Sequence, residues 1–220
     1  MKNLTEVVFI LDRSGSMSGL ESDTIGGFNS TIENQKKSED EVLVSTVLFD
    51  HESVVLHDRV PIAEIKPMTE EDYQVRGSTA LLDAIGDAIR HIKNVHKYAR
   101  EEDKPAKTLF VITTDGMENS SRRYSYKEIK ALVKKQQEKN GWEFLFLGAN
   151  IDAIDVAGSI GISARRAVNY HNDREGTEKK YRAVSHFMSA FAAAPRVGFA
   201  SAPIDDEWRK EVDEDFKSRK

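Results

Sequence analysis

Short, mostly apolar runs recur along the chain at positions 7–11, 109–113 and 144–147. Because neighbouring residues of a strand face opposite sides of a sheet, such runs predict strands that are buried on both faces. A buried helix can have a similar composition, but these runs are short and rich in Val, Ile and Phe, which favours strands. The pattern indicates a parallel sheet that is covered by helices on both sides.

Apolar residues between these runs recur every three or four positions, which predicts amphipathic helices. The predicted helices include residues 25–32, 81–95, 129–133 and 181–191. Ser125 and Glu128 have the spacing of a capping box, so we expect the third helix to begin just after Ser125. Gly26 and Gly27 weaken the first prediction, since a glycine inside a helix costs about 1 kcal/mol relative to alanine.

Residues 42–49 and 53–60 interrupt the alternation of strands and helices. They flank Asp50-His51-Glu52 and predict two strands joined by a tight turn, an antiparallel hairpin. The other strands alternate with helices, which implies right-handed βαβ crossovers and a doubly wound sheet. The predicted fold class is therefore α/β, and ligand sites in such folds lie beyond the carboxyl ends of the strands.

The loop after the first predicted strand carries Asp12, Ser14 and Ser16, with Gly15 between the two serines. Gly15 allows a sharp turn, so the loop can direct one carboxylate and two hydroxyls towards one point. Oxygen ligands of this kind suit Mg²⁺ or Mn²⁺, and no neighbouring His or Cys favours zinc. The alternative is a strand-to-helix turn in which Ser and Asp cap backbone groups.

Two further loops carry oxygen-bearing side chains at the same predicted edge of the sheet. Thr79 precedes the strongest predicted helix, where it can either cap the helix or reach a metal. Asp115 follows the next buried strand, and its alternative role is that of a turn residue before Gly116. Two aspartates placed close together repel each other unless a cation lies between them. We therefore favour a divalent-cation site that is built from Asp12, Ser14, Ser16, Thr79 and Asp115.

The composition narrows the functions that such a site can serve. The chain has 220 residues, of which 37 are acidic and 32 basic, so its formal net charge is −5. Without a dominant basic face, we expect neither nucleic acid nor a membrane as a partner. The absence of cysteine excludes disulfides, thiolate metal sites and a cysteine nucleophile. No apolar run has the length of a membrane span or secretion signal, so we expect a soluble, cytoplasmic protein.

With these motifs in place, the sequence resembles von Willebrand factor type A (vWA) domains. Residues 12–16 match the D-x-S-x-S element of that family, Thr79 matches its distal threonine, and residues 114–116 match its T-D-G element. The resemblance covers about residues 4–195 by the order of elements. It implies a Rossmann-like, mostly parallel sheet with one antiparallel edge strand and helices on both faces. Residues 146–162 look like the stand-alone vWA proteins of bacteria and phages, which are mostly of unassigned role.

The resemblance implies a metal-ion-dependent adhesion site (MIDAS), in which Mg²⁺ is held directly or through water. The implied ligands are Asp12, Ser14, Ser16, Thr79 and Asp115. The sixth position is left for a Glu or Asp carboxylate of a partner protein, because few direct protein charges leave the ion electrophilic. Mn²⁺ and Ca²⁺ are the alternatives to Mg²⁺. The five oxygen ligands come with no nucleophile–base pair, so the function we expect is non-enzymatic protein binding. By resemblance, bacterial relatives often work beside AAA+ ATPases or in larger assemblies.

We expect one vWA domain over residues 1–202 and a charged C-terminal tail or short helix over residues 203–220. Trp208, Val212 and Phe216 are four positions apart in this tail, so they would share one face of a helix. That face can pack on the domain, dock on another protein or stay frayed.

The alternative function is a magnesium-dependent phosphohydrolase of the haloacid-dehalogenase type. Such an enzyme also has an aspartate after its first strand, and a second aspartate two residues later acts as the acid/base. Ser14 occupies that second position here, and a hydroxyl cannot perform acid/base work at neutral pH. No lysine follows the relevant strand in a matching place either, so a binding module without a catalytic residue is the favoured function.

Overall fold

The computed structural model describes residues 4–38, 40–197, 200–201 and 203–219. Its centre is a six-stranded sheet with the strand order β3-β2-β1-β4-β5-β6. The strands are β1 (Thr5–Asp12), β2 (Val42–Phe49), β3 (Ser53–Pro61), β4 (Lys107–Thr114), β5 (Glu143–Gly148) and β6 (Ala167–Asn169). The edge strand β3 runs antiparallel to β2, and every other pair is parallel. The predicted α/β fold with one antiparallel edge strand is confirmed.

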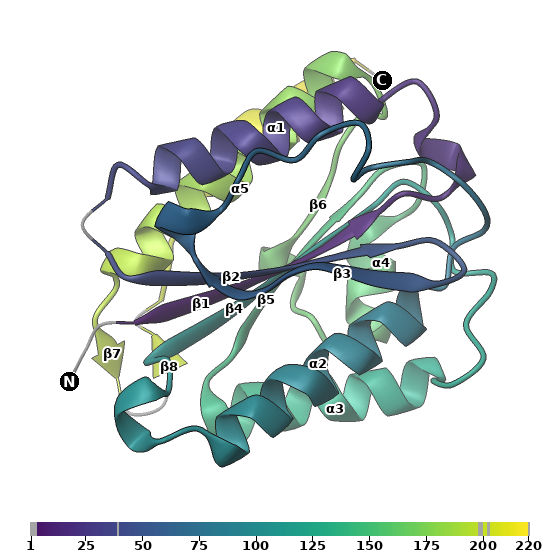
Figure 1. Cartoon of the computed structure of the whole chain (residues 1–220). Helices are drawn as coiled ribbons and strands as arrows, with labels where there is room; N and C mark the ends of the chain where they lie inside the picture. Colours follow the sequence, from purple (N-terminus) through teal and green to yellow (C-terminus); the bar gives the residue numbers. More distant parts are fainter. Residues whose placement is uncertain (1–3, 39, 198–199, 202, 220) are drawn as a thin grey trace.

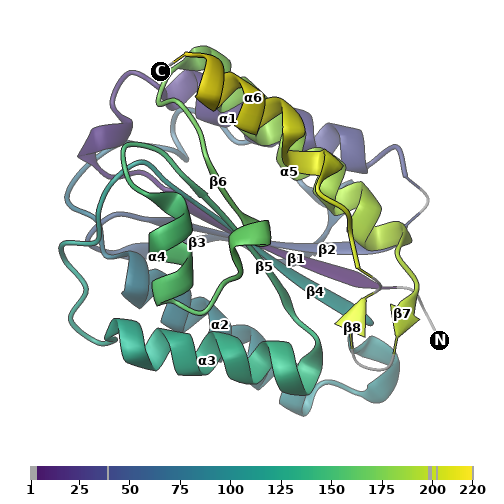
Figure 2. The same cartoon turned by 180° about the vertical axis from the view of Figure 1, so that it is seen from behind.

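Helices cover both faces of this sheet (Figure 1, Figure 2). One face carries α1 (Glu21–Gln35), α5 (Arg174–Ala193) and α6 (Lys210–Ser218), and the other carries α2 (Leu81–Tyr98), α3 (Tyr126–Asn140) and α4 (Ala153–Ser159). The short elements are the 3₁₀ turns η1 (Gly15–Met17), η2 (Ile62–Glu64), η3 (Glu101–Asp103), η4 (Ala164–Arg166) and η5 (Glu207–Arg209), and the small hairpin of β7 (Arg196–Val197) and β8 (Ala200–Ser201). Among the described residues, no helix is long and apolar enough to cross a membrane.

The central strands alternate their side chains between two apolar layers. Phe9 of β1 packs towards α1, where its ring centroid lies 5.2 Å from that of Phe28. Val8 and Ile10 point to the opposite layer beneath α2 and α3. All eight residues of β1 are buried, which explains why the central residues 7–11 are apolar on both faces.

Helix α1 contains Gly27 in spite of the cost of a glycine inside a helix. A Cβ atom at this position would lie 2.1 Å from Cδ2 of Tyr181 on α5. The missing side chain therefore lets the tyrosine ring lie directly against α1, and packing between the two helices outweighs the low helix propensity of glycine.

The start of α3 is the predicted capping box. The Ser125 hydroxyl accepts from the Glu128 amide, and the Glu128 carboxylate accepts from the Ser125 amide at 2.8 Å. The helix ends at Gly141, whose φ of +63° lies in the left-handed region that glycine adopts without strain.

The C-terminal segment packs on the domain. Trp208 is 4% exposed and Val212 is 1% exposed, and both belong to the apolar layer that includes α5. The Trp208 ring lies edge-on to Phe187 of α5 at 5.2 Å, and the Phe216 ring lies 4.9 Å from that of His171. Of the three arrangements open to this segment, the structure has the one in which it folds back on its own domain.

We expect Trp208→Ala to destabilise the protein by about 3 kcal/mol, because it removes a large buried side chain and leaves a cavity. Urea unfolding followed by circular dichroism measures this change. Tyr98→Ala is the matched control, since Tyr98 is 73% exposed and its loss should change stability by less than about 0.5 kcal/mol. Equal stabilities of Trp208→Ala and wild type would mean that the segment does not pack on α5 in solution.

Candidate metal centre

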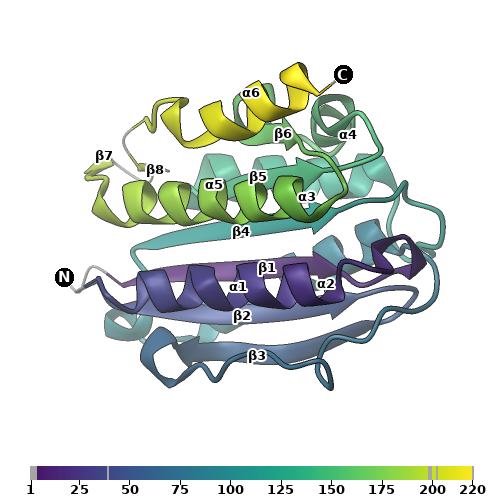
Figure 3. The same ribbon diagram turned by 90° about the horizontal axis from the view of Figure 1, so that it is seen from above.

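The loops after β1 and β4 meet at the carboxyl edge of the sheet, towards which both strand arrows point (Figure 3). Strand β1 ends at Asp12 and β4 ends at Thr114, and their last paired residues are Leu11 and Thr113. The parallel register therefore brings the two aspartate-bearing loops side by side, although they are far apart in the sequence.

Four of the five predicted site residues form one string of hydrogen bonds. The Ser14 amide donates to Oδ1 of Asp12 at 2.7 Å, and the hydroxyls of Ser14 and Ser16 lie 3.1 Å apart. The Ser16 hydroxyl donates to Oδ1 of Asp115 at 2.6 Å, which joins the loop after β1 to the loop after β4. The structure thus brings Asp12, Ser14, Ser16 and Asp115 together.

Thr79 lies beside this group, because its hydroxyl and that of Ser16 both lie close to the backbone of Gly116. A Cβ atom on Gly116 would lie 3.2 Å from the Ser16 hydroxyl and 3.3 Å from the Thr79 hydroxyl. The two hydroxyl oxygens therefore flank the same point, and glycine leaves that point open. The segment that carries Thr79 is fixed to the β1 loop by a hydrogen bond from the Gly15 amide to the Gly77 carbonyl, at 3.1 Å.

Thr79 does not cap α2, although its position before the helix offered that role. The N-cap residue is Ala80, and it makes no side-chain capping bond. The Leu82 amide instead donates to the Glu118 carboxylate at 2.9 Å, and the Asp83 amide donates to the Ser121 hydroxyl at 3.0 Å. Since the loop after β4 supplies the cap, the Thr79 side chain is not needed for it.

Burial dominates the electrostatics of the two carboxylates. Asp12 is 1% exposed, and this burial raises its pKa from the ordinary value of 3.8 to about 6. Two hydrogen-bond donors, Thr114 and Ser14, lower the pKa of Asp12 but offset only part of the effect of burial. The Thr114 hydroxyl donates to Oδ2 of Asp12 at 2.6 Å. Burial raises the pKa of Asp115 as well, against hydrogen bonds from Ser16 and Asn172 and the charge of Lys180. A bound cation would offset the cost of two charges in this place.

Three further residues support the aspartates: Thr114, which was named from the sequence only within the T-D-G match, and Asn172 and Lys180, which sequence reasoning missed. The Asn172 side chain follows β6 and donates to Oδ2 of Asp115 at 2.9 Å. Lys180 lies fully buried on α5. A signal for Lys180 was present, because it lies four residues before Val184 and thus on the apolar stripe of its helix, where a lysine is out of place.

The donor set fits a hard divalent cation. It offers two carboxylates and three hydroxyls, all oxygen, which suit Mg²⁺, Mn²⁺ or Ca²⁺. Among the described residues, no three His, Cys, Asp or Glu side chains cluster as a metal site. A metal at this edge of the sheet therefore depends on the hydroxyls as much as on the carboxylates.

Comparisons with known proteins identify the fold. No family model and no curated protein matches the sequence. Among solved structures, the vWF domain of the type V pili tip protein Mfa5 from Porphyromonas gingivalis is similar at a TM-score of 0.62 and 10% identity, covering 90% of this chain and 99% of that one. The D319A mutant of the PilB minor pilin from Streptococcus sanguinis is similar at 0.58 and 12% identity, covering 87% and 63%.

A third similar structure is the proximal thread matrix protein 1 from the mussel byssus, which has a zinc-occupied MIDAS motif. Its TM-score is 0.54 at 15% identity, and the match covers 84% of this chain and 45% of that one. This chain thus spans less than two thirds of the pilin and of the byssal protein. The likenesses establish that the chain has the fold of a von Willebrand factor type A domain.

We expect Asp12→Asn to abolish stabilisation by divalent cations and to leave the fold intact. The amide oxygen can still accept from the Ser14 amide, and the amide nitrogen can donate to Thr114, whose hydroxyl has the Gly116 carbonyl as another acceptor at 3.1 Å. Calorimetry should show a higher melting temperature in Mg²⁺ than in EDTA for the wild type and for a control variant at an exposed aspartate, but not for Asp12→Asn. Asp58→Asn, on the exposed part of β3, is the control. A magnesium shift that survives in Asp12→Asn would contradict the site.

In the metal-free protein, Asp12 should contribute a loss of stability as the pH rises from about 4 to about 6. The pKa of Asp12 is about 6 in the folded state against 3.8 ordinarily, so the folded state binds more protons in this window. The loss amounts to about 1.4 kcal/mol per unit of pKa difference. Urea unfolding in EDTA across this range should give a flatter profile for Asp12→Asn. If the free energy of unfolding changes with pH equally in the wild type and in Asp12→Asn, a titratable group other than Asp12 causes the change.

Proposed function

We propose that this chain is a metal-dependent protein-binding module. Asp12, Ser14, Ser16, Thr79 and Asp115 hold a divalent cation, and an acidic side chain of a partner protein completes its ligands. The observation that carries the proposal is the meeting of two buried carboxylates and three hydroxyls at one edge of the sheet. Magnesium is the favoured cation, with manganese and calcium as alternatives. Zinc, which occupies the MIDAS motif of the byssal protein, should be compared with these cations in binding experiments.

The exposure of the site residues supports access from one side. Asp12 and Asp115 are each 1% exposed, and Ser14 and Thr79 are buried as well. Ser16 and Gly15 are exposed, so the loop after β1 forms the open side of the site. Met117 next to Gly116 is 72% exposed and offers an apolar contact beside this opening. A partner carboxylate can therefore approach without a rearrangement of the core.

Binding, rather than turnover, is the chemistry that these side chains support. The position two residues after Asp12 holds the Ser14 hydroxyl, which lacks the acid/base capacity of a phosphohydrolase of the haloacid-dehalogenase type. Hydrolysis of an aryl phosphate that is lost in Asp12→Asn would favour the enzyme instead.

For the partner, we propose a protein of a larger assembly or an AAA+ ATPase, encountered in the cytoplasm. Two of the similar structures come from pilus proteins and one from a byssal thread matrix protein. We adopt an assembly partner by analogy with these proteins, which share the fold with this chain.

The direct test is capture of partner proteins on the immobilised chain. We expect binding in Mg²⁺ that is lost in EDTA and in Asp12→Ala/Ser14→Ala, whereas the surface variant Asp58→Ala binds like the wild type. A captured protein should then lose binding when one of its own Glu or Asp residues is changed to the amide. Capture of the same proteins by the EDTA-treated chain and by the double variant would exclude the mechanism.

A further inference from the structure

Lys180 is a fully buried cation whose role the fold alone does not explain. Its Nζ lies 3.4 Å from the Tyr170 hydroxyl and 4.5 and 4.7 Å from the ring centroids of Tyr170 and Tyr181. No carboxylate among the described residues lies within ion-pair distance of it. A buried ammonium without an ion pair is costly, so it either loses its proton or is offset by charges at longer range.

The partner charges are the two aspartates of the candidate metal centre. Burial lowers the pKa of Lys180 to about 7, and the charges of Asp115 and Asp12 act against this fall. The effect is mutual, because the Lys180 charge acts against the rise of the Asp115 pKa. The titratable groups that face the ammonium are thus Asp12 after β1, Asp115 after β4, Tyr170 after β6 and Tyr181 on α5.

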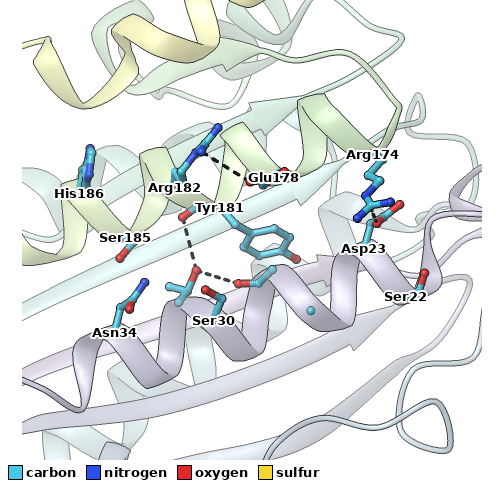
Figure 4. Close-up of a pocket in the computed structure, with 13 residues that line it drawn as sticks. Ser22, Asp23, Ser30, Asn34, Arg174, Glu178, Tyr181, Arg182, Ser185 and His186 are labelled. Carbon is cyan, nitrogen blue, oxygen red and sulfur yellow. Dashed lines mark hydrogen bonds and ion pairs between the residues drawn. The ribbon is translucent and has the colours of Figure 1, made fainter.

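An aromatic cage, formed by Tyr170 and Tyr181, holds the ammonium in place. The Tyr170 amide donates to the Gly148 carbonyl at 3.0 Å, and its hydroxyl lies 3.5 Å from the Thr114 carbonyl at the end of β4. Tyr181 lies between α1 and α5, as Figure 4 shows, in the space that Gly27 leaves open. Lys180 is therefore enclosed within the domain, whereas Ser16 is exposed and forms the open side of the site.

We propose that Lys180 is an internal counter-cation of the metal centre, which stabilises the Asp12 and Asp115 carboxylates when no divalent cation is bound and weakens divalent binding by repulsion. The inference rests on the proposed function, since it assumes a cation at the same carboxylates. It makes Lys180 a positioning residue that sets how readily the centre takes up and releases its metal.

The test is titration of Mg²⁺ into the metal-stripped full chain, for wild type and Lys180→Met. At pH 6.5 we expect the variant to bind about threefold more tightly once the affinity is corrected for protonation of the carboxylates, because the pKa of Asp12, about 6 in the wild type, rises when the counter-cation is removed. The gain is limited because an ammonium with a pKa of about 7 can release its proton when the metal binds. At about pH 8.5 the affinities should converge, since Lys180 is then neutral. Lys93→Met, which removes an exposed positive charge from α2, should match the wild type at both pH values.

Equal or weaker binding by Lys180→Met at pH 6.5 would overturn the inference. A second measurement needs no metal: the effect of Asp115→Asn on unfolding in EDTA, in wild-type and Lys180→Met backgrounds. We expect Asp115→Asn to raise the free energy of unfolding more, or lower it less, in the Lys180→Met background than in the wild type. The reason is that the Asp115 carboxylate has lost its counter-cation in that background. If the effects of Asp115→Asn and Lys180→Met on unfolding are not additive but no variant binds metal, the role of Lys180 as an internal cation is supported and the proposed metal-dependent function is rejected. Absence of coupling would overturn the inference.

Discussion

The burial of two carboxylates at adjacent strand ends is the constraint on which this edge of the molecule is built. Parallel pairing of β1 with β4 brings Asp12 and Asp115 into one place, and burial makes both charges unfavourable. The surrounding groups offset part of the unfavourable free energy of burying these two charges. Hydroxyls of Thr114 and Ser16 donate to the carboxylates, Asn172 donates from beyond β6, and Lys180 contributes a positive charge from α5. The centre thus draws on elements from most of the chain.

Much of this arrangement could be predicted from local sequence patterns. Strands such as β1 contain continuous apolar runs, so the rule for parallel sheets places the ligands that end or follow β1 and β4. Thr79 precedes α2 and follows the antiparallel strand β3, so it was assigned from its position before the helix and from the family resemblance. The cap of α2 could not be predicted in this way, because Glu118 and Ser121 supply it from a loop almost forty residues later. Strand β6 was missed because three residues carry too little pattern, and Asn172 was missed with it.

The comparisons separate what the fold determines from what the site determines. The similar structures share between 10% and 15% of residues with this chain, so what they have in common is the order and packing of elements. Such a fold positions loops at the carboxyl edge of the sheet without specifying their chemistry. The proposed function therefore depends on a few side chains in three loops, and it can be tested at these residues.

The capping of α2 by the loop after β4 ties the helix mechanically to Asp115. Side chains of Glu118 and Ser121 in the loop accept hydrogen bonds from backbone amides of the helix. In the other direction, the Asp83 carboxylate of the helix accepts hydrogen bonds from the backbone amides of Arg122 and Arg123. Loop and helix are therefore joined by hydrogen bonds in both directions. Because the inner face of the 18-residue helix α2 is buried in the core, these bonds anchor the loop that follows Asp115 to the interior of the domain.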